Sequence, residues 1–243
     1  MAEWFASLKD EFILNFIDDD RWLRLLKGLG ITLEITFFSV LIGIVLGVIV
    51  AAIRSTYDNT PNVKKKKGAS AFLLKFLNLL SNFYLTVIRG TPVVVQLLIG
   101  YYVIFAASNN KILVASLVFG INSGAYLAEI FRSGINSIDK GQMEAGRSLG
   151  FNYPKTMIYI IIPQAFKNVL PSIANEFIVL LKETSVAGYV ALEDLTKAAD
   201  IIRGRTFSAF MPLFAIAIIY LAVVMILTWL VKKLERRLKN SER

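Results

Sequence analysis

The chain of 243 residues contains no cysteine and no histidine. The lack of cysteine excludes a disulfide framework, an iron–sulfur cluster and a thiol nucleophile. The additional lack of histidine excludes the usual zinc sites and the Ser-His-Asp triad. Disorder is excluded as well, because hydrophobic residues make up 56% of the chain and so apolar a chain collapses. We therefore expect no metal site and no catalytic residues in this chain.

The net charge of +9 arises from 27 lysine and arginine residues against 18 aspartate and glutamate residues. The basic residues lie between long apolar runs and do not form an amphipathic stripe. This distribution is typical of a membrane protein with positively charged cytoplasmic loops. We therefore expect a protein in contact with membrane lipid and no nucleic-acid partner.

Long apolar segments indicate how often the chain crosses a bilayer. The hydrocarbon core is about 30 Å thick and requires about 20 mainly apolar residues in a helix. The sequence predicts an all-α polytopic membrane protein with about five transmembrane helices. The segments that meet or approach the required length are residues 31–53, 72–107, 112–131, 157–181 and 207–231.

The segment 72–107 is too long for one straight span and is interrupted at Arg89-Gly90-Thr91-Pro92. Polar residues between positions 75 and 82 make its first part too polar to face lipid on every side. We expect an amphipathic lead-in over residues 72–88, followed by a span through residues 92–107.

The lysine and arginine residues predict the orientation of the spans. Sixteen of them lie in the connections 54–75 and 132–156 and in the tail from Lys232, and eight lie on the other side. Because positively charged loops face the cytoplasm, we expect the N-terminus outside and the C-terminus inside.

Residues 1–28 carry acidic residues such as Asp10 and Glu11 where a signal peptide requires a basic start. Apolar residues recur there every three to four positions, which predicts an amphipathic helix. This helix could lie at the outer interface of the membrane or pack against the protein's own spans, and both alternatives remain open. We expect a first domain at residues 1–28 and a transmembrane domain at residues 29–243.

The connection at about residues 136–156 is long for a link between neighbouring spans. Residues 140–149 suit a short helix, which Gly150 can end in a left-handed conformation. Asn152 or Tyr153 can cap a following helix, because Pro154 is tolerated in a first turn. We therefore expect a helix-turn-helix that projects into the cytosol.

The short helix of this connection carries small and charged residues together. Ala145 and Gly146 would let a partner approach closely, while Glu144 and Arg147 offer charges for docking. Together with Gly150, these residues form the predicted contact surface for a partner protein.

Glu144-Ala145-Gly146 is followed after three residues by Gly150 and after nine more by Ile160-Ile161-Ile162-Pro163. The pattern resembles the EAA signature of the membrane subunits of bacterial ABC importers, with glycine in the third position. In that family the loop forms a coupling helix that sits in a groove of the ATP-binding subunit. The resemblance therefore implies the architecture of a type I ABC importer permease with a cytoplasmic coupling helix.

Three further motifs resemble the permeases for polar amino acids, which include histidine, arginine, lysine, glutamine, glutamate and opine permeases. They are Arg89-Gly90-Thr91-Pro92, the run from Gly124 to Arg132, and Lys182-Glu183-Thr184-Ser185. The resemblance covers about residues 25–235. It implies a multi-pass protein of the bacterial plasma (inner) membrane.

The chain contains no G-x-x-x-x-G-K-[ST] motif and therefore has no P-loop to hold the phosphates of ATP. The resemblance implies a transport subunit that is not itself an enzyme. The implied partners are two ATP-binding subunits, which would carry ATP and magnesium, a second permease, identical or paralogous, and an extracytoplasmic solute-binding protein. No cofactor is expected on this chain.

Polar residues inside a span are costly and indicate functional positions. In the third span Asn122, Tyr126 and Glu129 are spaced i, i+4 and i+7, which places them on one stripe with Ser123 beside it. We interpret them as candidates for the substrate pathway. Hydrogen bonding between helices is the alternative, and Glu129 could also pair with Arg132.

The fourth span repeats this spacing at Asn168, Ser172 and Asn175. The interruption in the second segment adds two candidates. Thr91 precedes a proline and is biased away from helix, and a kink there would expose Gln96 to the pathway.

Arg89, at the same interruption, is interpreted as a residue that extends to lipid headgroups. The connection 184–206 is expected to be a long loop at the outer gate. Asp200, within that connection, completes the candidate pathway.

Glu129, Glu176 and Asp200 would attract a cationic substrate. We therefore expect a polar, cationic L-amino acid (arginine, lysine or histidine) that is imported by alternating access. Glutamine or glutamate is the alternative substrate, since Lys167 and Arg89 could bind a carboxylate. A stand-alone secondary transporter or channel, which would move solute without ATP, is a further alternative.

Overall fold

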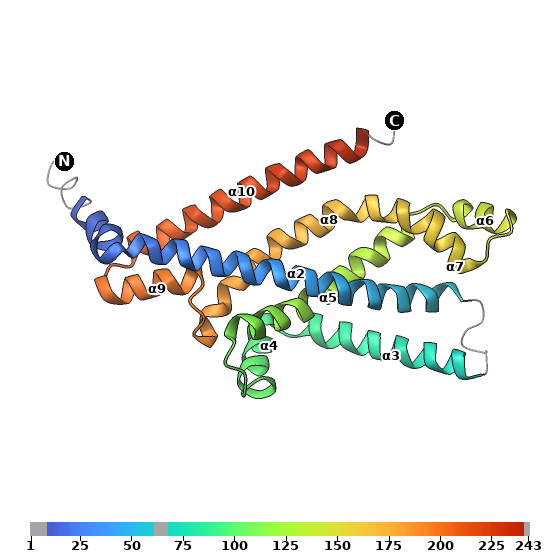
Figure 1. Cartoon of the computed structure of the whole chain (residues 1–243), viewed down its shortest axis with the longest axis horizontal. Coiled ribbons are helices and arrows are strands. Elements are labelled where there is room, and N and C mark those ends of the chain that lie inside the picture. Colours follow the sequence, from blue (N-terminus) through green and yellow to red (C-terminus); the bar gives the residue numbers. More distant parts are fainter. Residues whose placement is uncertain (1–8, 61–67, 241–243) are drawn as a thin grey trace. The chain divides into compact units, whose positions relative to one another are not determined.

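The computed structural model describes residues 9–60 and 68–240, and the regular structure in these ranges is entirely helical (Figure 1). The predicted all-α class is therefore confirmed. Ahead of the first long helix lie a π-helical turn, η1 (Ile13–Ile17), and a 3₁₀ turn, η2 (Asp18–Asp20). The remaining elements are α2 (Arg21–Asn59), α3 (Ala69–Gly90), α4 (Val93–Ile99), η3 (Gly100–Ile104), α5 (Lys111–Asn136), α6 (Lys140–Ser148), α7 (Tyr153–Thr156), η4 (Met157–Ile161), α8 (Ile162–Glu183), η5 (Thr184–Val190), α9 (Leu195–Thr206) and α10 (Phe210–Asn240).

In the described ranges, five helical stretches are long and apolar enough to cross a membrane, which confirms the predicted number of spans. The first, third and fourth stretches extend beyond the predicted segments at both ends, because polar residues continue the helices. The five stretches are Lys9–Asn59, Ala69–Gly90, Lys111–Asn136, Tyr153–Val190 and Phe210–Leu238.

The assignment of the second span to residues 92–107 is wrong. Helix α3 has the length and hydropathy of a span, whereas the apolar helix after it, Val93–Ile104, is too short. Two polar residues of α3 are satisfied inside the protein: the Tyr84 hydroxyl donates to the carbonyl of Ile121 at 2.5 Å, and Ser81 is buried. An amphipathic helix can cross a bilayer when its polar face packs on another span.

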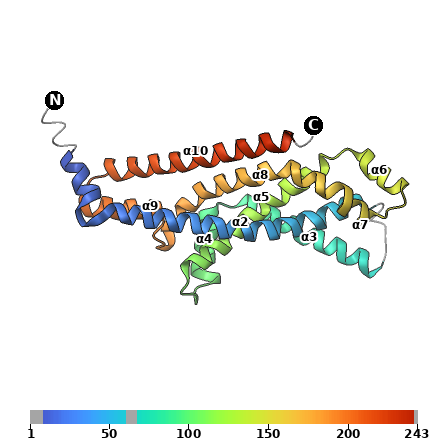
Figure 2. The same ribbon diagram turned by 45° about the horizontal axis from the view of Figure 1, so that its top comes forward.

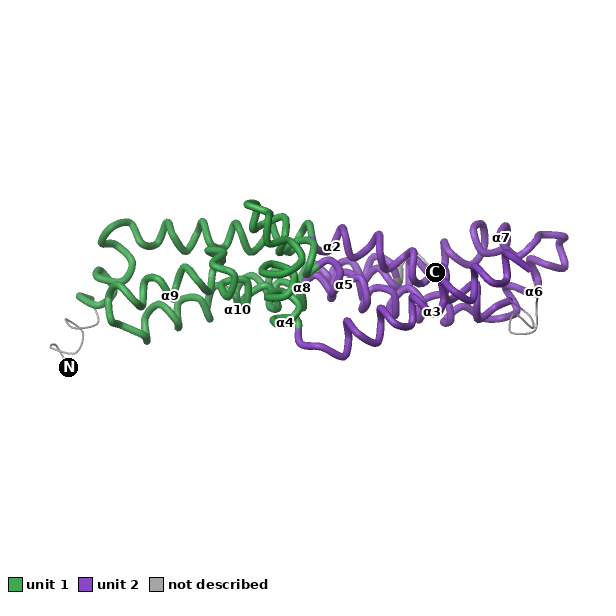
Figure 3. The backbone as a smooth tube through the Cα atoms, turned by 90° about the horizontal axis from the view of Figure 1, so that it is seen from below, with its two compact units in different colours: residues 1–38, 93–119, 178–230 green, residues 39–92, 120–177, 231–243 purple. Residues whose placement is uncertain are grey.

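The chain divides into two compact units (Figure 3). Unit 1 comprises residues 1–38, 93–119 and 178–230, and unit 2 comprises residues 39–92, 120–177 and 231–243. The boundaries fall inside α2, α5, α8 and α10, so each of these helices contributes one part to each unit.

In unit 1 a hydrophobic cluster joins α9 to the N-terminal segment and to α10. Phe16 and Leu25 are buried together with residues of α9 such as Leu195 and Ile202, and Ile216 of α10 completes the cluster. The Thr206 hydroxyl also donates to Asn15 Oδ1 at 2.8 Å. These contacts favour the second of the two alternatives for the N-terminal segment, in which it packs against the protein's own helices.

The predicted boundary at residue 28 does not coincide with a break in the structure. Helix α2 already begins at Arg21 and continues past residue 28 without interruption. The chain bends instead at Asp19 and Asp20, which both have positive φ. Short polar residues such as aspartate are among those that adopt this conformation most readily.

In unit 2 helix α2 packs closely against α5 through glycine. A Cβ atom at Gly47 would lie 2.9 Å from Cβ of Leu127, and one at Gly43 would lie 3.2 Å from the backbone nitrogen of Gly124. The two glycines are spaced i, i+4 and lie on one face of α2. Small residues allow helix backbones to approach in membranes, where packing contacts replace the hydrophobic driving force.

We predict that Gly47→Ala lowers the thermal unfolding midpoint of the purified protein in detergent, because the new methyl group overpacks the contact with Leu127. Overpacking of this kind costs about 1–3 kcal/mol. The matched control is Gly30→Ala on the same helix, where no atom lies within 4 Å of the new Cβ and where alanine favours helix. Equal midpoints for the two variants would contradict the prediction.

Candidate functional site

Helices α6 and α7 form the predicted helix-turn-helix of unit 2 (Figure 2). The Asp139 side chain caps α6 by accepting a hydrogen bond from the Gly141 N–H at 2.7 Å. Gly150 follows α6 with a φ of +86°. Asn152 caps α7 by accepting from the Lys155 N–H at 3.1 Å, and Pro154 lies in the first turn. The local structure predicted for this connection is confirmed.

The faces of α6 differ from the predicted partner surface at one position. Glu144, Ala145 and Arg147 are exposed, but Gly146 is buried. A Cβ atom at Gly146 would lie 2.6 Å from Cγ2 of Thr156, at the end of α7. The small size of Gly146 therefore allows α6 to pack closely against α7, and Gly146 is not part of the exposed surface of α6.

The predicted stripe on α5 divides into a buried and an open part. Asn122 and Ser123 are buried, whereas Tyr126 is exposed and Glu129 is half-buried. The Ser123 hydroxyl donates to Oε1 of Glu176 on α8 at 3.0 Å, which is the interhelical hydrogen bond that the sequence left open as an alternative. The Tyr126–Glu129 end of the stripe lines a hollow.

Glu129 lies among three arginine side chains. Its carboxylate is 3.6 Å from Arg132 of the same helix, as expected, and also 3.5 Å from Arg89 and 3.9 Å from Arg54. The Arg89 guanidinium further lies 5.8 Å from the ring centre of Tyr126. Arg89 is exposed, and its guanidinium also contacts Glu129 and Tyr126 of α5, which the interpretation as a lipid-facing residue did not include.

A hollow of about 550 Å³ opens beside this cluster in unit 2. Its walls come from α2, α3 and α5, all within candidate membrane spans. Its lining is mainly polar for such a position. The lining residues are Arg54, Asn82, Leu85, Thr86, Arg89, Gly90, Tyr126 and Glu129.

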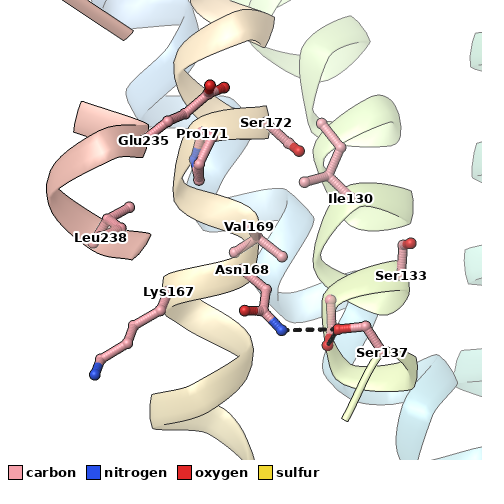
Figure 4. A pocket seen from close by; sticks show the side chains of 11 residues that line it. Ile130, Ser133, Ser137, Lys167, Asn168, Val169, Pro171, Ser172, Glu235 and Leu238 are labelled. Carbon is pink, nitrogen blue, oxygen red and sulfur yellow. Dashed lines mark hydrogen bonds between the residues drawn. The ribbon is translucent and has the colours of Figure 1, made fainter. Parts of the chain in front are cut away.

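The predicted stripe on α8 is exposed along its length, since Asn168, Ser172 and Asn175 all lie on the surface of unit 2. Asn168 and Ser172 line a cavity of about 570 Å³ between α5, α8 and the end of α10 (Figure 4). The Asn168 amide donates to Ser137 Oγ at 3.1 Å.

The same cavity gathers further polar side chains from three helices. Figure 4 shows Ser133 and Ser137 on α5, Lys167 on α8 and Glu235 on α10. Hydroxyl, amide, ammonium and carboxylate groups together suit a polar solute, because each can exchange a hydrogen bond with it.

Thr91 and Gln96 are the two candidates at the predicted interruption. Thr91 has extended backbone after the end of α3, and its hydroxyl donates to the carbonyl of Val87 at 2.8 Å. Gln96 is partly buried on α4, and the two residues belong to different units. The predicted interruption itself is confirmed, because α3 ends at Gly90 and α4 begins at Val93.

The sequence predicts a loop for the connection 184–206, and this prediction is wrong. The connection consists mainly of η5 and α9. Asp200 accepts hydrogen bonds from Lys197 at 2.9 Å and from Arg203 at 2.5 Å, both on its own helix. These hydrogen bonds lower the pKa of the Asp200 carboxyl. Two cations therefore already compensate the charge that the sequence argument assigned to substrate attraction.

Asp194 holds the start of α9 in the interior of unit 1. Its carboxylate accepts hydrogen bonds from the N–H groups of Lys197 and Thr196 at 3.0 and 3.3 Å, as an N-cap residue does. The residue is fully buried. Burial raises the pKa of its carboxyl to about 6, although the two N–H donors act in the opposite direction.

Comparison with known families decides the identity of this architecture. The model of the family described as "Binding-protein-dependent transport system inner membrane component" matches residues 68–240. The chain belongs to this family. It is a permease subunit.

Named relatives agree with this assignment. The arginine transport system permease protein ArtQ of Bacillus subtilis is 36% identical over 222 residues, which cover 90% of this chain and 94% of the relative. The glutamine transport system permease protein GlnP of Escherichia coli is 37% identical over 160 residues, which cover 64% and 73% of the two chains.

A solved structure, titled as the crystal structure of an amino acid ABC transporter with histidines, is 36% identical to the permease. It has a TM-score of 0.77, with 96% of this chain and 98% of that chain covered. A chain of the inward-facing MetNI methionine ABC transporter has a TM-score of 0.75 at 16% identity, which shows the shared fold alone.

Family membership settles several expectations. The permease is a non-enzymatic membrane component of an ABC importer, and ATP hydrolysis takes place on another subunit. The alternative of a stand-alone secondary transporter or channel is thereby excluded. The predicted location in the inner membrane is confirmed.

Sequence reasoning missed several residues that line the two hollows. Ser133 and Ser137 follow Glu129 at intervals of four, so an extension of the α5 stripe would have found them. Arg54 lies at the start of the connection 54–75 and Glu235 in the tail from Lys232, segments from which only the orientation of the spans was predicted. No sequence signal pointed to Glu235, because its place in the cavity depends on the packing of α10.

We predict that Asp194→Asn changes the pH dependence of the permease's thermal stability. The pKa of Asp194 is raised in the fold, so its contribution to stability is fully present below about pH 3.8 and is lost as the pH rises through about 6. Asparagine keeps the capping oxygen but cannot ionise, so the variant should gain up to about 3 kcal/mol over the wild type above pH 6. Unfolding midpoints between pH 4 and 7.5 provide the measurement.

Asp200→Asn is the control for this experiment. The pKa of Asp200 is lowered, so its contribution is present above its ordinary pKa and is lost only as the pH falls further. This variant should retain the wild-type decline between pH 4 and 7. A decline that persists in Asp194→Asn would show that another group causes it.

Proposed function

We propose that the permease imports polar L-amino acids with a cationic side chain, namely arginine, lysine or histidine, by alternating access. Its N-terminus would lie outside and its C-terminus inside the cell, in accordance with the distribution of basic residues. The name of the arginine permease relative, at 36% identity, supports this substrate class.

The observation that carries the substrate class is the position of Glu176. Its carboxylate lies within a candidate span, half-buried, beside the exposed polar stripe of α8. It accepts a hydrogen bond from Ser123 on α5, which holds it between two helices of unit 2. A carboxylate inside a membrane span is costly, and attraction of a cationic solute is a reason to keep it there.

The exposed stripe of α8 supplies a path for the polar backbone of such a substrate. Asn168, Ser172 and Asn175 offer amide and hydroxyl groups at intervals of one helical turn. Neutral polar groups can exchange hydrogen bonds with a passing solute without holding it tightly. Of the carboxylates proposed from sequence, Glu176 is the one that lies on the same helix as this stripe, directly after Asn175.

The transport cycle requires partners that carry the energy. We propose that the exposed residues Glu144, Ala145 and Arg147 of α6, ended at Gly150, contact an ATP-binding subunit. Two such subunits would bind ATP and magnesium, and this chain would bind no cofactor. A second permease subunit and an extracytoplasmic solute-binding protein complete the proposed importer.

Glutamine or glutamate is the second candidate substrate. Several relatives are named as glutamine permeases, among them a putative one of Rickettsia felis at 33% identity over 94% of this chain. Of these two, only glutamate would offer an additional, side-chain carboxylate to the arginine side chains around Glu129.

We predict that Glu176→Gln raises the KM for arginine uptake about tenfold, because one attractive charge in a low-dielectric site is worth at least about 1.4 kcal/mol. The assay is ATP-driven uptake of labelled arginine, lysine, histidine, glutamine and glutamate into liposomes that contain the complete importer. Glu34→Gln, which removes a carboxylate from α2, is the matched control and should leave the KM unchanged.

Two results of this assay would contradict the substrate proposal. Uptake of glutamine or glutamate in preference to the cationic amino acids would select the second candidate. An arginine KM that is the same in Glu176→Gln and in the wild type would remove Glu176 from recognition.

We predict that Glu144→Lys abolishes ATP-dependent uptake while the membrane complex still binds the amino acid, because the reversed charge blocks docking of α6 on the ATP-binding subunit. Gln142→Lys is the control, since residue 142 is exposed on the same helix but two positions away and therefore faces another direction. Normal uptake by Glu144→Lys, or equal loss in both variants, would contradict the proposed contact surface.

A further inference from the structure

The charged side chains around Glu129 do not balance one another. Arg54, Arg89 and Arg132 surround Glu129, and Arg132 also pairs with Asp58 at 3.1 Å. We call these five residues the arginine cluster. Three guanidinium groups face two carboxylates, so the arginine cluster carries one excess positive charge.

The geometry of the arginine cluster leaves room for another acceptor. The distances from Glu129 to Arg89 and Arg54, 3.5 and 3.9 Å, exceed the 2.7–2.9 Å that is typical of a charge-assisted hydrogen bond. Each guanidinium has five N–H donors. Two carboxylates cannot accept hydrogen bonds from all the donors of three guanidinium groups. Arg54 Nε is buried, and no acceptor among the described residues lies within hydrogen-bond distance of it.

The position of the arginine cluster makes this excess charge costly. Its residues belong to candidate membrane spans, where an uncompensated charge is strongly disfavoured. Arg54 and Arg89 both border the hollow of about 550 Å³, whereas Arg132 lies outside its lining. An anion that enters this hollow would meet two guanidinium groups and restore neutrality.

We infer that the hollow bordered by Arg54 and Arg89 binds the α-carboxylate of the transported amino acid. This inference rests on the proposed function. Arginine recognises carboxylates through paired N–H donors, which a compact ammonium group does not offer. Thr86 and Asn82 in the same wall add neutral polar groups for the remainder of the solute. The arginine cluster thus recognises the carboxylate that amino acids share, and Glu176 distinguishes among side chains.

The test measures binding to the purified complex of permease and ATP-binding subunit, without the solute-binding protein, by titration calorimetry. The probes are L-arginine and L-argininamide, with L-glutamine and L-glutaminamide in parallel, because each amide lacks the carboxylate. The wild type should prefer the amino acid to its amide by about tenfold to a hundredfold. Arg89→Gln and Arg54→Gln should each reduce this preference at least about fivefold through weaker binding of the amino acid.

Two variants separate recognition from folding. Arg89→Lys keeps the charge and the contact with Glu129, so it should fold and retain part of the preference. Arg24→Gln removes an arginine of α2 that pairs with Glu193 at 3.2 Å in unit 1 and does not line the hollow, and it should keep the full preference. A loss of affinity for amino acid and amide alike in Arg89→Gln and Arg54→Gln would show a structural role and overturn the inference.

The remaining outcomes are also distinct. If Arg89→Gln and Arg54→Gln prefer the amino acid to its amide as strongly as the wild type does, the carboxylate site lies elsewhere and only this inference fails. If the wild type binds only L-glutamine and L-glutaminamide, the proposal of a cationic substrate fails. The preference for the carboxylate is then measured with these two probes. A lipid phosphate is the remaining possible occupant of the hollow. In that case phosphatidylglycerol in the vesicles would change the uptake activity of the wild type but not that of Arg89→Gln, and both proteins would prefer the amino acid to its amide equally. This result would overturn the inference.

Discussion

The close packing of α2 against α5 in unit 2 is the contact on which the candidate sites depend. Glycines on both helices make it possible: Gly43 and Gly47 face Leu127 and its neighbours, while Gly120 and Gly124 face Ile42 and Leu46. Apolar side chains gain little by leaving lipid for another helix, so contact area and polar bonds must hold the spans together. Glycine provides that area because it lets the backbones approach.

This packing also determines which polar side chains can meet. With α2 and α5 in contact, Arg54 near the end of one helix lies within reach of Glu129 on the other. Helix α3 joins the pair through Tyr84, which donates to the backbone of α5, and its last turn then carries Arg89 to the same carboxylate. The hollow beside these charges is therefore a consequence of how three spans pack.

Unit 2 also contains the proposed coupling helix, so the residues proposed to face the substrate and those proposed to face a partner share one compact body. Gly134 on α5 illustrates the link, since a Cβ there would overlap Cγ1 of Val169 on α8. Gly146 plays the same part between α6 and α7. Bodies packed this tightly transmit a displacement rather than absorb it, which is what alternating access requires of the helices between the two kinds of surface.

The sequence by itself determined the features that depend on local chemistry. Apolar length predicted the spans, and the caps at Asn152 and Gly150 predicted the helix-turn-helix, because these signals act within a few residues of the chain. Only the tertiary structure decided which helices share a face. It placed Arg89 on Glu129, buried Gly146, paired Asp200 within its own helix and made α3 the second span. Each of these depends on neighbours distant in sequence or on competing partners, and a charge or a polar face in the sequence does not reveal which partner satisfies it.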